Sequence, residues 1–191
     1  MTHEEFIKAI DILTSPIENP KWRVQSVYPR EHPTTAVVVP YIDSRMVQER
    51  LDIALGPDNW SNTYDPESGA GSISIRVDGE WITKADVGAE SKIDKEKGKA
   101  SDAFKRAAVM WGIGRDVYKL GDQRLKCNNY GKPLTAKNEV LSTSSMLSNY
   151  MNKMNESEGC LYRIWLLNES LHKDDNFKAI LGELKTYVKN K

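Results

Sequence analysis

The stretch DVGAESKIDKEKGKASDAFKRAAVMWGIGRDVY, residues 86–118, sets the architecture expected for this chain. It starts at the end of a strand, continues through a lysine-rich loop and becomes a helix that Gly112 and Gly114 end. A 3.6-residue period places small and apolar residues on one side of this helix: Ala100, Ala103, Phe104, Ala107, Ala108, Met110 and Trp111. The other side carries Lys99, Asp102, Lys105 and Arg106. The pattern predicts a helix that packs closely on a sheet and exposes its charges.

The residues before this helix predict the sheet. Residues 60–64 form a strand, and Ile73, Ile75 and Val77 alternate toward a core before Asp78-Gly79, a strong hairpin signal. That turn pairs Arg76 with Trp81. A second hairpin, residues 22–28 and 34–39, and helices over 3–13 and about 44–55 precede it. We therefore predict an α+β fold: an antiparallel sheet backed by a long helix, with a β-β-β-α core and a helical C-terminal appendage.

The composition of the chain changes after Cys127. We predict one domain over residues 1–126, a linker or weak helix over 127–157 and a helical C-terminal segment over 158–191. The last helix carries an apolar stripe: Phe177, Ile180, Leu181, Leu184 and Val188. Two interpretations of this stripe remain: it folds onto a neighbouring surface of the chain, or it docks a protein partner.

The net charge of the chain does not by itself indicate a nucleic-acid-binding protein. The chain has 27 Lys and Arg against 27 Asp and Glu, and only residues 84–126 are locally basic, eleven cations against seven acidic residues. A solvated helix face of mixed charge is the alternative explanation of that excess. Cys127 and Cys160 show no zinc or disulfide spacing, and no apolar run is long enough to span a membrane, which predicts a cytosolic protein.

Several separate motifs together resemble one known family. The motifs nearer the N-terminus are Tyr41-Ile42-Asp43-Ser44-Arg45, Leu51-Asp52, Leu55-Gly56-Pro57 and Trp60. The motifs that follow them are Asp86-Val87-Gly88, Lys97, Asp102, Lys105-Arg106-Ala107, Trp111-Gly112 and Gly114. In this order they resemble the Rad fifty-two superfamily of single-strand DNA annealing proteins, above all the Sak-type annealases of phages. The resemblance covers residues from about 22 to 120.

This resemblance implies a function and a set of DNA-contacting residues. The family anneals complementary DNA strands in recombination and repair, as oligomeric rings with the strand in a groove. Lys105 and Arg106 match the principal residues of that groove, Lys97 matches a further basic position, and Arg45 fits the upstream arginine of the phage pattern. Val109 departs from the eukaryotic protein, which has another cation there, so the groove here is less basic.

The remaining predicted DNA contacts are Lys84, Lys95, Lys99, Arg76 and Arg115. For two sets an alternative stays open. Arg76 beside Trp81 also suits a local cation–π pair that holds the hairpin. Lys105 and Arg106 also suit ordinary surface charges paired with Asp102. Whether Lys92, Lys95 and Lys99 form a second strand site is open.

These observations predict a DNA-annealing protein that uses neither nucleotide nor cofactor. The sequence has no phosphate-binding GK[ST] motif, and cations on rigid elements suffice to hold a phosphate backbone. We predict no catalytic residue and no metal. The expected partners are single-stranded DNA, further copies of the chain and, through the C-terminal segment, a single-stranded-DNA-binding protein. The expected location is the cytoplasm of a prokaryote or a phage-infected cell, at the nucleoid.

Two alternatives belong to other functional classes. Asp86, Glu90 and Lys92, with Asp65 or Asp78 upstream, superficially suit a metal-dependent nuclease in which carboxylates hold magnesium and the lysine orients water. Magnesium-dependent cleavage of DNA would distinguish that function from annealing. A purely structural oligomerising module would bind no DNA.

Overall fold

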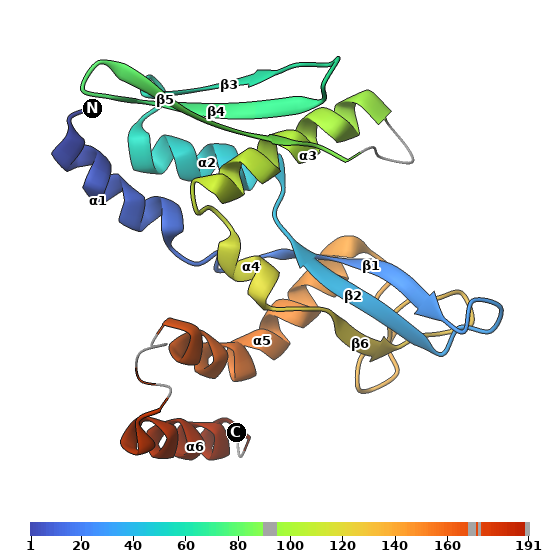
Figure 1. Cartoon of the computed structure of the whole chain (residues 1–191). Coiled ribbons are helices and arrows are strands. Elements are labelled where there is room, and N and C mark those ends of the chain that lie inside the picture. The colour runs from blue at the N-terminus through green and yellow to red at the C-terminus, as the bar shows by residue number, and fades with distance from the viewer. Residues whose placement is uncertain (90–94, 168–170, 172, 190–191) are drawn as a thin grey trace. The chain divides into compact units, whose positions relative to one another are not determined.

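The computed structural model describes residues 1–89, 95–167, 171 and 173–189, which form two compact units (Figure 1). Unit 1 consists of Met1–Lys21 and Pro40–Asp122. Unit 2 consists of Trp22–Val39 and Gln123–Lys191. Unit 1 is thus largely an insertion between two parts of unit 2.

The sheet of unit 1 has three antiparallel strands in the order β3-β4-β5. They are β3 (Trp60–Tyr64), β4 (Ala70–Val77) and β5 (Glu80–Val87). The β4–β5 turn consists of Asp78 and Gly79, whose φ values of 49° and 88° are those of a tight two-residue hairpin. Its register pairs Arg76 with Trp81, as predicted. Ile73, Ile75 and Val77 of β4 are buried, which confirms the predicted alternation.

Helix α3 (Lys95–Met110) packs against this sheet, and α1 (His3–Thr14), α2 (Ser44–Leu55) and α4 (Arg115–Lys119) complete the unit. Ala103, Ala107, Ala108 and Trp111 are buried, as the helical period predicted. Met110 was wrongly assigned to the packing side, because its side chain is 46% exposed. The alanine-lined face is narrower than predicted, and Met110 lies beyond its border at the last residue of the helix.

Unit 2 contains a second three-stranded sheet in the order β1-β2-β6. Its strands are β1 (Lys21–Tyr28), β2 (Thr35–Tyr41) and β6 (Gln123–Lys126). The predicted hairpin of β1 and β2 is present. On its other edge, β2 also pairs antiparallel with β6, with Thr35 opposite Lys126. The described residues therefore form two small sheets where one was expected. The α+β class is confirmed; the four-residue strand β6 was too short for the sequence pattern to reveal.

Residues 127–157, predicted as a linker or weak helix, include two isolated β-bridges and the first half of the long helix α5 (Ser144–Leu167). Trp22 of β1 is fully buried. Its backbone N–H donates to Ser148 Oγ at 2.9 Å, and its indole N–H donates to Asn152 Oδ1 at 3.1 Å. Ser148 and Asn152 are one helical turn apart on α5, so both side chains can reach Trp22. The polar residues that indicated a linker are therefore, in part, the hydrogen-bond partners of a buried tryptophan. The functional boundaries after residues 126 and 157 stay a prediction.

The last helix is α6 (Asp175–Lys189). Asp174 caps it by accepting a hydrogen bond from the Phe177 backbone N–H at 2.8 Å. On its apolar stripe Ile180 is 57% exposed and Leu184 38% exposed. The side chain of Val188 lies outside the described residues.

Candidate nucleic-acid interface

Two glycines of the sheet hold α3 unusually close to β4 and β5. A Cβ atom added to Gly71 would lie 2.8 Å from the Cβ of Ala103, and one added to Gly88 would lie 2.7 Å from the Ala103 backbone nitrogen. Both separations are too short for real atoms, so only glycine fits at either position. The helix is therefore fixed on the sheet, and its outer face is presented in a single orientation.

That outer face carries the predicted cation pair. Lys105 Nζ lies 3.6 Å from Asp102, one turn earlier on the same helix. Arg106 Nη2 lies 3.1 Å from Asp86, so this pair links α3 to the end of β5. Asp102 also accepts a hydrogen bond from the Ala89 backbone N–H at 2.9 Å. Lys105 thus makes the contact with Asp102 that its structural interpretation predicted, whereas Arg106 has a different partner.

These ion pairs leave both cations accessible. The side chain of Lys105 is 24% exposed and that of Arg106 is 48% exposed. Exposed ion pairs contribute only about 0–1 kcal/mol, because water solvates the separated charges well. A phosphate that approaches this face can therefore replace a carboxylate at little cost. The two ion pairs position Lys105 and Arg106, and both cations can still bind an anion.

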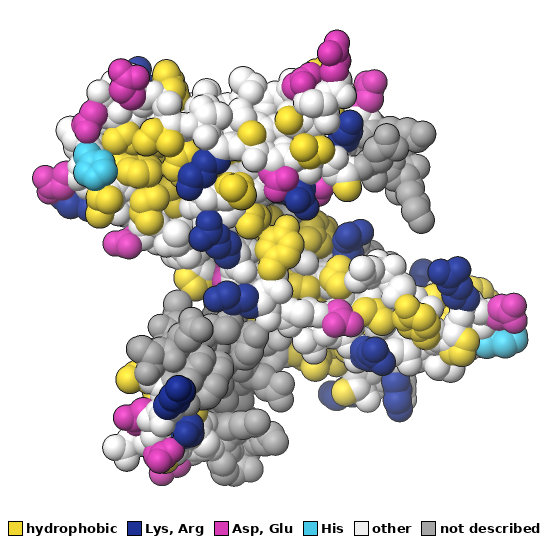
Figure 2. Space-filling view, in the orientation of Figure 1, with side chains coloured by type: hydrophobic (Ala, Val, Ile, Leu, Met, Phe, Trp, Pro, Cys, Tyr) yellow, Lys and Arg dark blue, Asp and Glu magenta, His cyan; other side chains and the backbone are white. Residues whose placement is uncertain are grey.

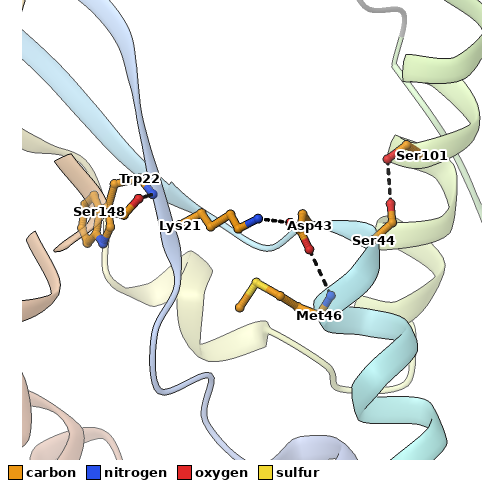
Figure 3. Close-up of polar contacts among 7 residues, drawn as sticks. All are labelled: Lys21, Trp22, Asp43, Ser44, Met46, Ser101 and Ser148. Carbon is orange, nitrogen blue, oxygen red and sulfur yellow. Dashed lines mark hydrogen bonds and ion pairs between the residues drawn. The ribbon is translucent and has the colours of Figure 1, made fainter. Parts of the chain in front are cut away.

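Arg45 lies near α3 because the beginning of α2 is hydrogen-bonded to that helix. Ser44 Oγ is 2.7 Å from Ser101 Oγ (Figure 3). Lys97 and Lys105 stand one turn before and one turn after Ser101, so they share its flank of the helix. Arg45 is exposed, and its side chain forms no hydrogen bond or ion pair with another described residue. Through this contact the start of α2, which carries Arg45, lies beside the stretch of α3 that carries Lys97 and Lys105.

The cap of α2 fixes this corner of unit 1. Asp43 accepts a hydrogen bond from the Met46 backbone N–H at 3.0 Å and forms an ion pair with Lys21 (Figure 3). Partial burial opposes the charged form of Asp43, but the hydrogen bonds from Lys21 and Met46 outweigh it and lower the pKa of the carboxyl. The start of α2, and with it Arg45, is held in place by a carboxylate that stays charged.

Lys84 and Arg115 have contacts of a different kind. Lys84 Nζ donates to the Met110 carbonyl at 3.0 Å and lies 4.2 Å from the centre of the Trp111 ring. Arg115 donates to the carbonyls of Val109 and Met110 at 2.9 and 3.0 Å. Two cations therefore cap the C-terminal end of α3, where the helix dipole favours positive charge. Their predicted DNA contacts stay a prediction, since both have a structural role.

The other predicted contacts are dispersed over unit 1. Arg76 lies 5.8 Å from the centre of the Trp81 ring near the β4–β5 turn, which confirms the predicted cation–π pair. Lys97 is exposed, whereas Lys99 is half-buried, with its side chain over Gly69 in the turn before β4. The side chain of Lys95 is outside the described part of the chain, as is all of Lys92.

Two carboxylates of the nuclease alternative, Asp78 and Asp86, lie far apart. Asp78 lies in the turn at one end of the β4–β5 hairpin and Asp86 lies near the other end, six residues along β5. Since a strand rises about 3.3 Å per residue, these two carboxylates cannot hold one metal ion. Asp65 accepts hydrogen bonds from Ser68 and Glu67, which lower its pKa. Glu90 lies outside the described residues. Among the residues that are described, no group of three or more His, Cys, Asp or Glu side chains could hold a metal ion.

The cations of unit 2 were not among the predicted DNA contacts. Arg23, Arg124, Lys126 and Lys132 are all exposed there. Arg124 and Lys126 lie inside the basic stretch 84–126 counted in the sequence, but most of the cations in that stretch belong to unit 1. A charge count over residues 22–39 and 123–155 would have found the whole group, but only the fold shows that these segments belong together.

Comparison with known proteins gives two partial matches. The single-stranded DNA-binding protein DdrA of Deinococcus radiodurans is 40% identical over 94 residues, 47% of this chain and 45% of that protein. DdrA of Deinococcus deserti is 37% identical over 98 residues, 49% of this chain and 48% of that protein. The chain thus spans about half the length of the curated relatives it matches. No protein-family model matches it, and neither does any solved structure. Among the described helices, none has the length and apolar character of a membrane span.

Proposed function

We propose that this chain binds single-stranded DNA and anneals complementary strands without nucleotide hydrolysis, as a homo-oligomer in DNA recombination or repair. Its similarity to two proteins named as single-stranded DNA-binding carries the first part of this proposal. The arrangement of Arg45, Lys97 and Lys105 around one side of α3 supports it. No covalent step is involved, so the chain acts as a binding protein and not as an enzyme.

The outer face of α3 suits annealing because it offers charge without aromatic rings. Asp102, Lys105 and Arg106 occupy this face, whereas Phe104 and Trp111 are buried. Cations hold the sugar-phosphate backbone, whereas exposed rings would stack on the bases and compete with pairing. A strand held only by its phosphates keeps its bases available to a complementary strand.

Affinity supports the oligomeric part of the proposal. Each phosphate contact on single-stranded DNA contributes a salt-dependence slope of about 0.7, so three or four contacts per chain give a slope of only about 2 to 3 and weak binding. Several chains on one strand multiply the effective affinity without new contacts. We therefore propose a ring or a similar closed assembly, with the outer faces of α3 lining one continuous groove.

The deciding experiment replaces the cation pair. We expect Lys105→Ala with Arg106→Ala to leave the oligomer intact and to remove most binding of an oligothymidine, because it removes two contacts from every subunit. Lys8→Ala with Lys173→Ala is the matched control, since it removes the same charge from α1 and from the segment before α6. Binding is measured by fluorescence anisotropy, annealing without ATP by strand pairing, and assembly by light scattering and electron microscopy.

The outcomes separate the parts of the proposal. Unchanged annealing in the Lys105, Arg106 variant would refute the assignment to α3. Absence of binding by the unmodified chain at low salt, or magnesium-dependent degradation of the DNA, would refute the function itself. Removal of residues 174–191 tests the C-terminal segment: loss of a single-stranded-DNA-binding partner with intact annealing supports docking by α6, whereas loss of folding supports an internal packing role.

A further inference from the structure

Unit 2 holds most of the uncompensated positive charge of the chain. Residues 22–39 and 123–155 contain seven Lys and Arg but only two acidic residues, Glu31 and Glu139. The chain has 27 of each, so the rest has 20 cations and 25 acidic residues. The neutral total therefore conceals a basic region and an acidic remainder. Figure 2 shows Lys and Arg side chains on both sides of an apolar strip over the lobe that carries β1, β2 and β6.

These seven cations differ from those on α3 because they have no carboxylate partner among the described side chains. All are exposed: Arg23, Arg30, Arg124, Lys126, Lys132, Lys137 and Lys153. Among the side chains that the structure describes, none of the seven forms an ion pair. Like charges held together without counter-charges produce a positive potential that attracts a polyanion.

Four of these cations line two adjacent hollows of unit 2. The first, of about 300 Å³, is lined by Arg23, Lys132, Pro133, Ser142, Thr143 and Ser144. The second, of about 240 Å³, is lined by Arg124, Lys126, Leu134, Thr135, Asn138 and Tyr150. Pro133 and Leu134 are consecutive, so the two hollows lie on either side of one short segment. Each hollow combines two cations with hydroxyl or amide groups, which is the chemistry that binds phosphate oxygens.

An exposed tyrosine precedes this segment on a well-fixed turn. Tyr130 is 88% exposed, although tyrosine normally buries its ring in part. Asn128 Oδ1 accepts from the backbone N–H groups of Tyr130 and Lys132, both at 3.0 Å, and the Asn128 N–H donates to the Lys132 carbonyl at 3.0 Å. Gly131 has a φ of 73°, and a Cβ there would lie 2.9 Å from Val27 of β1. The turn is therefore seated on the sheet and presents the ring to solvent.

We propose that unit 2 carries a second binding site for single-stranded DNA, separate from the outer face of α3. The two hollows take phosphates of one strand, with Arg23 and Lys132 at the first and Arg124 and Lys126 at the second. One base stacks on Tyr130. This site rests on the proposed function, since it adds a second contact region to the same activity.

The chemistry favours an unpaired nucleic-acid strand over other polyanions. An acidic peptide would satisfy the cations but leaves the ring of Tyr130 without a partner. The bases of duplex DNA are already stacked on one another. A single ring engages a single base, so neighbouring bases stay available for pairing. A subunit with one site in each unit can hold a strand on the outer face of α3 and a further segment on unit 2.

The test removes the four lining cations together: Arg23→Ala, Arg124→Ala, Lys126→Ala and Lys132→Ala. The matched control removes four exposed cations outside that group of seven: Lys8→Ala, Lys119→Ala, Lys173→Ala and Lys178→Ala. We expect the first variant, but not the control, to lower the salt-dependence slope for oligothymidine by about 2 to 3, since each lost phosphate contact removes about 0.7. Thermal unfolding verifies that both variants remain folded.

Tyr130 provides an independent readout. Tyr130→Ala is expected to weaken oligothymidine binding about tenfold, because one stacked base is lost, whereas Tyr130→Phe keeps the ring and the affinity. Ultraviolet cross-linking of a bromouracil oligonucleotide to the unmodified chain should recover the peptide that contains Tyr130.

The results distinguish failure of this site from failure of the proposed function. If the unmodified chain binds and the four-cation variant matches its control, the second site is refuted while the proposed function stands. If the unmodified chain does not bind oligothymidine, both fail. If polyglutamate or duplex DNA displaces the strand at equal concentration and Tyr130→Ala has no effect, unit 2 is a general polyanion surface and the inference is overturned.

Discussion

The outer face of α3 and the basic surface of unit 2 present positive charge in opposite ways. On α3, Lys105 and Arg106 each have a carboxylate within 4 Å. In unit 2, none of the cations around the hollows has such a partner among the described side chains. A paired cation has a defined position but a weak field, whereas unpaired cations produce a stronger field with less positional order. Under the two proposals made above, α3 determines how a strand lies and unit 2 increases how readily the strand is attracted.

The interiors of the two units differ as well. In unit 1, Gly71 and Gly88 let α3 approach the sheet closely. In unit 2, the fully buried Trp22 connects β1 to α5 with two hydrogen bonds. Unit 1 has its own buried indole, Trp111, whose N–H donates to the Ile73 carbonyl at 3.0 Å. In each unit a buried tryptophan thus joins a helical segment to a strand.

The largest expected effect tests whether the units are separate folding entities. We expect Trp22→Ala and Trp111→Ala each to cost about 3–5 kcal/mol, since a large buried ring and its hydrogen bond are lost. Hydrogen exchange resolved by peptide should show increased exchange mainly in unit 2 for the first variant and in unit 1 for the second. Uniform exchange across both units in either variant would show that they unfold together.

A smaller effect tests the close approach of α3. Gly88→Ala is expected to reduce the free energy of unfolding by about 1–3 kcal/mol, because the added methyl group would overlap the Ala103 backbone. Gly182→Ala in α6 is the control: a Cβ there meets nothing within 4 Å, and alanine is the better helix former. Denaturant unfolding measures both. Equal stability of the two variants would show that α3 can move away from the sheet.

The contrast between paired and unpaired cations predicts a gain of affinity. Asp86→Asn with Asp102→Asn removes the two carboxylates that compete with phosphate on α3, so oligothymidine should bind a few-fold more tightly. Glu139→Gln removes an acidic residue of unit 2 that pairs with no described cation, and it should change affinity less. Anisotropy titrations at two salt concentrations measure both changes. Weaker binding by the Asp86, Asp102 variant would mean that the carboxylates are needed to position the cations.

The smallest expected effect concerns pH and the two helix caps. The pKa of Asp43 is below its ordinary value of 3.8 in the folded chain, so its stabilisation is present above that pH and is lost as the pH falls through the folded pKa. Asp43→Asn should therefore cost under about 1 kcal/mol at neutral pH and nothing in strong acid. Thr143 caps α5 without a charge, accepting from the Met146 N–H at 3.2 Å. Thr143→Ala should cost about 1 kcal/mol at either pH, which denaturant titrations can verify.

Local patterns predicted unit 1 well because all of its elements except α1 lie in one continuous stretch, Pro40–Asp122. The Asp78-Gly79 turn, the alternation of β4 and the alanines of α3 are all short-range signals, and each is observed. The pairing of Lys105 with Asp102 was one of the two interpretations of that lysine, because the two residues are three apart on one helix. The contact of Arg106 with Asp86 joins a helix to a strand, so no local sequence pattern indicated it.

Unit 2 was predicted less well because its contacts join distant parts of the chain. The pairing of Thr35 with Lys126 and the contact of Trp22 with Asn152 have no signature in sequence spacing. The basic group of unit 2 was missed for the same reason, since its members become neighbours only after folding. Charge that cancels over a whole sequence can still be concentrated on one unit of the fold.

The discontinuity of unit 2 also affects how the chain can be synthesised and shortened. On the ribosome, the β1–β2 hairpin emerges long before β6 and α5, so Trp22 lacks its covering helix and one edge of β2 lacks a partner strand during that interval. Exposed strand edges and apolar rings are sites of misassociation in nascent chains. A fragment that ends at residue 126 would retain β6 but keep Trp22 permanently uncovered.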